Sequence, residues 1–172
     1  MPVLTAPFRL STRSGLVLDV RPVDEADEPV LAALFDRVSA EDRRFRFLHA
    51  SEHVGHAELD PLVHPDHFRT ESWLATDAAT GEAVATALLA CDNALDTAEV
   101  AVSIGADHRG KGVGWALLDL LAEQARKRGV RRVISIEDRA NHAAIELERE
   151  KGFVPEAFDG DPTLVILAKH FR

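Results

Sequence analysis

Tyrosine is absent from this chain of 172 residues, and cysteine and methionine occur once each. A lone cysteine, Cys91, excludes a disulfide within the chain and fits a reducing compartment such as the cytoplasm. It ends an apolar run, which favours a packed thiol over a nucleophile. No apolar run approaches the roughly 18 residues that span a bilayer, and residues 1–14 lack the apolar stretch of a secretory signal. We therefore expect a cytoplasmic protein with no membrane segment.

Positive charge is also scarce, since the chain has 20 lysines and arginines but 29 aspartates and glutamates, which gives a net charge of −9. Non-specific nucleic-acid binding needs a cationic surface, so no nucleic-acid partner is expected. A cationic partner surface would suit this charge, although solubility alone explains it equally well. No linker rich in proline, serine or glycine divides the sequence. Residues 1–172 therefore predict a single domain, with residues 1–14 as an N-terminal extension.

Hydrophobic patterning predicts strands and helices in a mixed order. The expected strands cover residues 16–23, 73–76, 83–91, 98–104, 130–136 and 164–168, and the expected helices cover 25–38, 41–47, 112–128 and 141–151. Asp24 is placed to cap the first helix, and Gly129 to follow the third. Residues 49–70 are polar and predict a loop. An antiparallel front followed by a parallel crossover indicates an α/β fold around a mixed sheet.

The segment that joins the strand at 98–104 to the helix at 112–128 is rich in glycine. Glycine lets backbone N–H groups approach phosphate oxygens, and a helix N-terminus adds free N–H groups and the positive end of its dipole. This segment therefore predicts a site for a phosphate-bearing cofactor.

Two well-known phosphate loops do not fit the segment. A nucleotide P-loop needs serine or threonine where this chain has Gly112. A dinucleotide fingerprint needs a third glycine where Trp115 stands, and an acidic residue in the region that Arg131 and Arg132 occupy.

The pattern Arg109-x-x-Gly112-x-Gly114 resembles the Q/R-x-x-G-x-G/A motif of the GNAT superfamily of N-acetyltransferases, which binds the pyrophosphate of acetyl-CoA. A second motif of that superfamily, N-x-x-A-[IL]-x-L-x-x-x-x-G-F, is matched by Asn141, Ala144, Ile145, Leu147, Gly152 and Phe153. The resemblance covers residues 98–153. It implies a GNAT fold, in which about four helices flank a mixed central sheet of six to seven strands, and acetyl-CoA as cosubstrate.

The same resemblance implies a set of cofactor-binding residues. The pyrophosphate would lie on Arg109, Gly110, Lys111, Gly112, Val113 and Gly114. The pantetheine arm would run along Val102, Ser103 and Ile104, as an added strand would. Asn141 would contact the cofactor from the second helix, although an ordinary helix N-cap predicts the same residue type.

Acetyl transfer to an amine requires a base, because an alkylammonium has a pKa of about 10.4 and must lose a proton before it attacks. Glu99 begins the strand that leads to the glycine-rich segment, and partial burial there would raise its pKa toward neutrality. Residues 98–102 resemble the A-E-F-A-V stretch of bacterial Pat-type protein lysine acetyltransferases, whose glutamate is the base. The alternative is an ordinary glutamate at a strand edge.

A weaker resemblance to the same group covers residues 39–47. Ser39, Glu41, Arg46 and Phe47 match its L-S-x-E-S-x-x-x-R-F segment, and Asp42 replaces the second serine. A capped polar helix with packed phenylalanines explains this segment equally well. Many GNAT members also place a tyrosine general acid where this chain has Glu148. The leaving thiolate would then be protonated by water or not at all.

Several histidines lie in or near the expected loop. They are His49, His53, His56, His64 and His67, with Glu52, Asp60 and Asp66 nearby. Their spacing repeats no known ligand pattern, so no metal is expected. Their other role would be to line the entrance for the acceptor. His108 is expected on the loop surface.

These residues together predict an acetyl-CoA-dependent N-acetyltransferase that transfers acetyl directly to an amine, with a protein lysine as the leading acceptor. A small amine is the nearest alternative acceptor, and a non-catalytic acyl-CoA-binding module is an alternative of another class. The sequence leaves the acyl chain length and the oligomeric state open, a homodimer included.

Overall fold

One mixed β-sheet runs through the described chain. The computed structural model describes residues 7–47, 56–158 and 160–171. Within them the sheet has eight strands in the order β1-β2-β3-β4-β5-β6-β8-β7, which is more than the six to seven expected. The strands are β1 (Phe8–Ser11), β2 (Val17–Pro22), β3 (Thr70–Asp77), β4 (Ala83–Cys91), β5 (Thr97–Ile104), β6 (Arg132–Asp138), β7 (Val154–Ala157) and β8 (Leu164–His170). Only the β5–β6 pair is parallel among them, so the predicted mixed sheet is confirmed.

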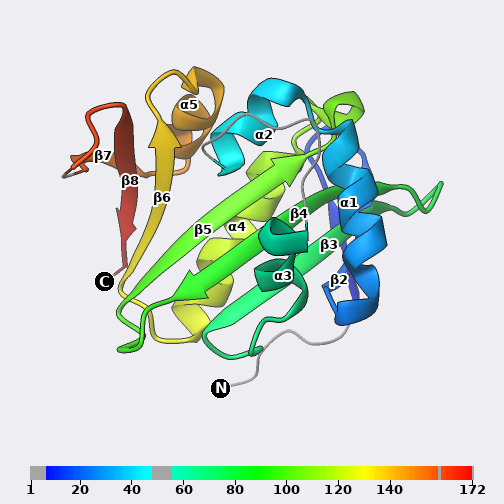
Figure 1. Ribbon diagram of the computed structural model, residues 1–172, viewed down its shortest axis with the longest axis horizontal. Helices are drawn as coiled ribbons and strands as arrows, with labels where there is room; N and C mark the ends of the chain where they lie inside the picture. The colour runs from blue at the N-terminus through cyan, green and yellow to red at the C-terminus, as the bar shows by residue number, and fades with distance from the viewer. Residues whose placement is uncertain (1–6, 48–55, 159, 172) are drawn as a thin grey trace.

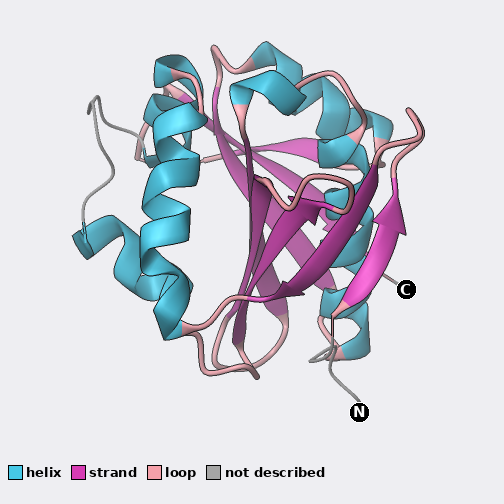
Figure 2. Cartoon of the chain, turned by 90° about the vertical axis from the view of Figure 1, so that its right-hand side faces the viewer, coloured by secondary structure: helices cyan, strands magenta, loops and turns pink. Residues whose placement is uncertain are grey.

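Helices cover both faces of the sheet. They are α1 (Glu28–Arg37), α2 (Ala40–Phe47), α3 (His56–Val63), α4 (Val113–Lys127) and α5 (His142–Glu150). Figure 1 shows α1 and α3 in front of the sheet and α4 behind it, and Figure 2 shows the sheet between its two helical layers. No helix of the described chain has the length and apolar character needed to cross a membrane.

Each helical layer has its own hydrophobic core. On the α4 face, Leu117 and Leu121 are fully buried against strand residues such as Leu89. On the opposite face, Leu31 and Phe35 of α1 are fully buried in a second cluster. Burying a side chain of this size contributes about 1.5–3 kcal/mol. The two cores cover the central strands on both faces, and the ends of those strands carry the candidate site.

The structure corrects several expectations. Residues 56–63, expected as loop, form α3, and residues 8–11 of the expected N-terminal extension form β1. The first helix begins at Glu28 after a short 3₁₀ turn at Glu25–Asp27, because Pro29 lacks an N–H and fits only the first turn of an α-helix. Asp24 does cap this turn, by accepting a hydrogen bond from the Ala26 amide at 2.8 Å.

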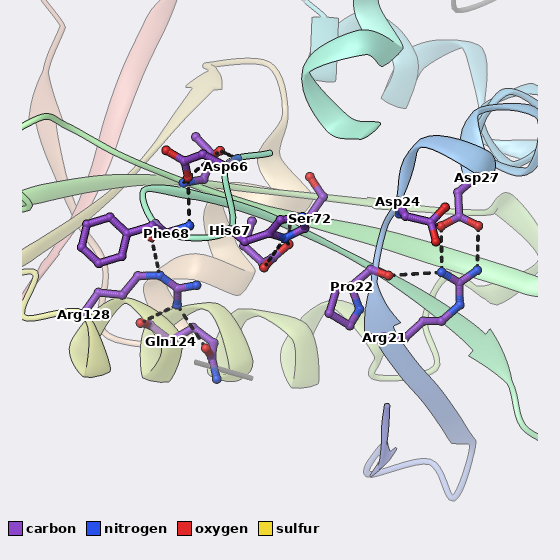
Figure 3. Close-up of polar contacts among 12 residues, drawn as sticks. Arg21, Pro22, Asp24, Asp27, Asp66, His67, Phe68, Ser72, Gln124 and Arg128 are labelled. Carbon is purple, nitrogen blue, oxygen red and sulfur yellow. Dashed lines mark hydrogen bonds and ion pairs between the residues drawn. The ribbon is translucent and has the colours of Figure 1, made fainter. Parts of the chain in front are cut away.

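Two arginines join separate segments of the chain by hydrogen bonds (Figure 3). Arg21 on β2 donates two hydrogen bonds of 2.7 Å to Asp27, and these bonds lower the pKa of that carboxyl. Arg128, buried after α4, donates to the Phe68 carbonyl at 2.8 Å and to the Gln124 carbonyl at 3.1 Å. Gly129 follows with a φ of 84°, as expected for the residue that ends a helix.

Candidate active site

The two central parallel strands separate just after Glu99. β5 pairs with β6 only from Thr97 to Glu99, whereas it pairs with β4 from Ala98 to Ile104. The β6-facing edge of residues 100–104 is therefore free of strand partners. An unpaired strand edge can pair with another extended chain of amide groups.

The direction of the amides along this free edge follows from one hydrogen bond. The Gly105 amide donates to the Val84 carbonyl of β4 at 2.8 Å. Successive strand amides point to opposite edges, so the amides of Val102 and Ile104 point away from β4, into the gap. The amide of Ser103 faces β4, which leaves only its buried side chain to face a ligand.

A cavity of about 310 Å³ fills this gap. Its walls come from β5, from the ends of β6 and α2, from the glycine-rich segment and from one side of α5. The predicted site residues that line it are Glu99, Val102, Ser103, Ile104, Arg109, Gly110, Gly114 and Asn141. A neighbouring hollow adds Lys111, Gly112 and Val113. The structure therefore brings together all of the residues that the sequence assigned to the site.

The glycine-rich segment ends in a helix N-terminus without a side-chain cap. Gly112 precedes α4 with a φ of 81°, and no side chain of the described residues hydrogen-bonds this N-terminus. The first amides of α4 are thus available to an anion, which also meets the positive end of the helix dipole. Gly114 lies tightly packed, since a Cβ there would stand 3.0 Å from Leu147 Cδ2 and 3.3 Å from Ile104 Cδ1.

Charged side chains surround this N-terminus. The Arg109 Nε lies 3.5 Å from Asp42 Oδ2 on α2, a partly exposed pair that a phosphate can replace at small cost. The turn between β1 and β2 also reaches the segment, because Ser14 Oγ donates to the Lys111 carbonyl at 2.5 Å. His108 is buried at 8% exposure, so its expected place on the loop surface is wrong.

Glu99 lines the cavity at the point where β5 and β6 separate. Its side chain is exposed, so the expected partial burial is wrong. Arg46 of α2 lines the same wall. Burial lowers the pKa of Arg46, and the nearby carboxylates of Glu99 and Glu137 raise it in opposition. The sequence analysis singles out Arg46 only as part of a motif, because nothing in residues 39–47 reveals that α2 covers the end of β5.

Asn141 caps the N-terminus of α5, which is the role that the sequence offered as the alternative to a cofactor contact. Its Oδ1 accepts from the Ala144 amide at 3.4 Å, and its Nδ2 donates to Glu137 Oε2 at 3.2 Å. Glu137 also accepts from Ser135 Oγ at 2.7 Å. Asn141 lines the cavity as well, so capping and a cofactor contact are compatible. Sequence reasoning missed Ser135 and Glu137, which only the crossing of β6 and α5 brings into the site.

Glu148 on α5 is the most buried acid of the cavity wall, at 4% exposure. Burial raises its pKa from the usual 4.5 to about 10, and the charge of Glu137 beside it acts in the same direction. The carboxyl therefore holds a proton at neutral pH. No pattern in the sequence of α5 would have revealed this.

The other candidate side chains lie away from the cavity or outside the description. Burial raises the pKa of Cys91, which fits the packed thiol expected there. Among the described residues, no group of three or more histidine, cysteine or acidic side chains could hold a metal ion. His49, Glu52 and His53 lie outside the described residues, and the side chain of His56 is likewise not described.

Comparison with known proteins identifies the fold. Residues 24–153 match the model of the acetyltransferase (GNAT) family. The chain belongs to the GNAT family. An acetyltransferase of Pseudomonas aeruginosa, PA5475, is 30% identical over 151 residues, which cover 86% of this chain and 80% of that protein.

Solved structures agree with this family. The GNAT domain of S. lividans PAT superposes with a TM-score of 0.87 and is 27% identical, over 96% of this chain and 97% of that one. A cAMP-binding acyltransferase from Mycobacterium smegmatis has a TM-score of 0.64 at 24% identity, over 96% of this chain and 47% of that one. GNAT proteins use acetyl-CoA as cosubstrate. The free β5 edge and the uncapped α4 N-terminus match its extended amide-bearing arm and its pyrophosphate.

The packing at Gly114 gives a test of this cofactor site. A Gly114→Val substitution is expected to weaken acetyl-CoA binding roughly 10- to 100-fold, because the new methyl groups must displace Leu147 and Ile104 from the cavity wall. Isothermal titration calorimetry measures the change. Ala122→Val, on the same helix but outside the cavity lining, is the control and should bind normally. Equal affinity for both variants would place the cofactor elsewhere.

Proposed function

We propose that this GNAT protein transfers the acetyl group of acetyl-CoA directly to an amine, with Glu99 as general base, and that the acceptor is a protein lysine. The observation that carries this proposal is the position of Glu99, on the cavity wall where β5 stops pairing with β6. The strand edge beyond it would hold the cofactor arm. The thioester would then end beside the Glu99 carboxylate.

The length of β5 supports this arrangement. Ile104 lies next to the glycine-rich segment, and Glu99 lies five residues earlier, about 16 Å along an extended strand. A cofactor anchored by its pyrophosphate at α4 and extended along this edge would bring its reactive end toward Glu99. The carboxylate would remove a proton from the incoming ammonium, and the free amine would attack the thioester carbonyl.

The acceptor proposal is supported by charge and by similarity. Glu99 and Glu137 supply negative charge to the wall that a cationic lysine side chain would approach. The GNAT domain of S. lividans PAT covers nearly all of this chain. The stretch from Ala98 to Val102 also resembles that of Pat-type protein lysine acetyltransferases. Both likenesses favour a protein acceptor over a small amine.

Radiolabelled acetyl-CoA tests this function in a bacterial lysate that is then split into protein and small-molecule fractions. We expect label on protein lysines with the wild type and with Glu146→Gln, a control on the outer side of α5, but not with Glu99→Gln. Label confined to small amines would overturn the lysine acceptor. Tight cofactor binding with no transfer to any amine would instead indicate a non-catalytic acyl-CoA-binding module.

A further inference from the structure

The turn that joins β1 to β2 forms one side of the hollow beside the main cavity. This hollow measures about 320 Å³ and lies next to the uncapped N-terminus of α4. Arg13 and Ser14 of the turn line it together with Lys111 and Trp115. The turn lies outside residues 24–153, which match the family model, so the GNAT motifs assign no role to it.

Hydrogen bonds fix this turn against the glycine-rich segment. Ser14 Oγ donates to the Lys111 carbonyl at 2.5 Å and shares a second hydrogen bond of 2.9 Å with Thr12 Oγ1. The stem of the Arg13 side chain passes over the backbone just before α4, since a Cβ on Gly112 would stand 3.1 Å from Arg13 Cγ. The Arg13 side chain therefore starts from a fixed point at the edge of the hollow.

Trp115 supports the charged end of Arg13. The guanidinium carbon of Arg13 lies 4.2 Å from the centroid of the Trp115 ring, which is a cation–π contact. Lys151 Nζ also contacts this ring, at 3.6 Å from the centroid, but it forms an ion pair of 2.7 Å with Asp119. Arg13 has no carboxylate partner among the described residues. Its positive charge is therefore available to an anion in the hollow.

The chemistry of the hollow suits a phosphate monoester. Arg13 and Lys111 are exposed at its edge, and none of its lining residues in the described chain is acidic. The planar guanidinium of arginine can donate two parallel N–H groups to two oxygens of one phosphate. CoA carries a phosphate monoester on the 3′ oxygen of its ribose, in addition to the pyrophosphate that the α4 N-terminus would take. The charge of this group, about −1.5 to −2 at pH 7, matches the two cations of the hollow.

We propose that Arg13, held against Trp115 at the edge of the hollow, binds the 3′-phosphate of CoA and so selects acyl-CoA over acyl groups on carrier proteins. The protein-bound phosphopantetheine of a carrier protein has the same amide-bearing arm and thioester, but it has no ribose and no 3′-phosphate. Such a thioester can pair with the free edge of β5 but leaves the hollow empty. The proposal rests on CoA as the cosubstrate of the proposed function, and it is independent of Glu99 and of the acceptor.

Calorimetric titrations with acetyl-CoA and with acetyl-3′-dephospho-CoA test this role. The wild type should bind acetyl-CoA about 10- to 100-fold more tightly than the dephospho form, because only acetyl-CoA offers a phosphate to the guanidinium. Arg13→Gln should bind both forms alike, and Arg13→Lys should keep part of the preference because it retains the charge without the fork. Arg131→Gln, which removes an exposed arginine outside both cavity linings, should keep the full preference. An equal loss of affinity for both forms in Arg13→Gln, or an undiminished preference, would overturn the proposal.

Adenosine 3′,5′-bisphosphate separates this proposal from the proposed function, because it has the 3′-phosphate but no pantetheine arm and no thioester. Its binding is followed by the fluorescence of Trp115, since the other tryptophan of the chain, Trp73, is fully buried in the core. We expect it to change the emission of the wild type, to bind Arg13→Gln about 10-fold or more weakly, and to leave the emission of Trp115→Phe unchanged.

Each result bears on one proposal at a time. No binding to the wild type, or equal binding to Arg13→Gln, would overturn the role of Arg13 even in a protein that acetylates lysine. A change of emission that persists in Trp115→Phe would place the ligand elsewhere and overturn it too. Binding that depends on Arg13, without acetyl transfer to any amine, would support Arg13 and reject the acetyltransferase function.

Discussion

Replacing Glu148 with glutamine is expected to stabilise the folded protein at neutral pH by on the order of 3 kcal/mol. The pKa of Glu148 is raised from 4.5 to about 10, so between these values the folded state binds one proton more than the unfolded state. The free energy of unfolding therefore falls by about 1.4 kcal/mol for each unit that the pH rises in this range. The stability that the proton on Glu148 gives the wild-type protein is complete below pH 4.5 and is lost as the pH rises through the folded pKa. Glutamine carries no such dependence.

Urea denaturation at pH 5, 7 and 9 measures this difference. The variant and the wild type should be close in stability at pH 5, and the advantage of the variant should grow at pH 7 and pH 9. Glu146→Gln, exposed on the same helix, should follow the wild type at each pH. A stability difference that stays constant across the three values would show that Glu148 is ionised in the folded protein.

Replacing Glu99 with glutamine is expected to lower kcat on the order of 100- to 1,000-fold at neutral pH, because the acceptor ammonium loses its base. The variant should keep its stability to within about 0.5 kcal/mol, since the side chain is exposed. Its acetyl-CoA affinity should also stay unchanged. Steady-state kinetics with a purified acceptor measure the first effect, and thermal unfolding and calorimetry measure the other two.

The pH dependence distinguishes a base from a positioning role for Glu99. Above the acceptor's own pKa the amine is already free, so the deficit of Glu99→Gln should shrink as the pH rises toward 10 or so. Glu146→Gln should match the wild type throughout. A deficit of the same size at every pH would mean that Glu99 orients the acceptor and removes no proton.

The two variants differ in their expected effect on stability for a physical reason. Glu148 costs folding free energy above pH 4.5 because its burial demands a proton. Glu99 is exposed and costs the fold little.

The sequence predicted best where local chemistry decides the structure. β5, the glycine-rich segment and α4 were expected because alternation, positive-φ glycines and helical periodicity all occur within a continuous stretch. The cap at Asp24 and the helix end at Gly129 follow equally local rules. The residues assigned to the cofactor came from this continuous stretch and from one helix start, and they do meet at one cavity and the hollow beside it.

The sequence failed where packing between distant segments decides. The polar, histidine-rich composition of residues 49–70 predicts a loop, whereas α3 forms there because its buried Leu59 and Leu62 pack in the core cluster with α1. β1 has only four residues and forms because β2 pairs with it. The raised pKa of Glu148 comes first from burial in the folded protein and then from Glu137 on β6, so no sequence window contains its cause.

The early end of β5–β6 pairing makes the sheet two parts joined by three residue pairs, Thr97–Arg132, Ala98–Val133 and Glu99–Ile134. A cofactor that pairs with the Val102 and Ile104 amides and contacts α5 would close the seam between these parts. Binding would then raise the free energy of unfolding, by about 2.7 kcal/mol at a ligand concentration 100 times the dissociation constant. The abundance of this GNAT protein in a cell would then rise and fall with its acyl-CoA pool.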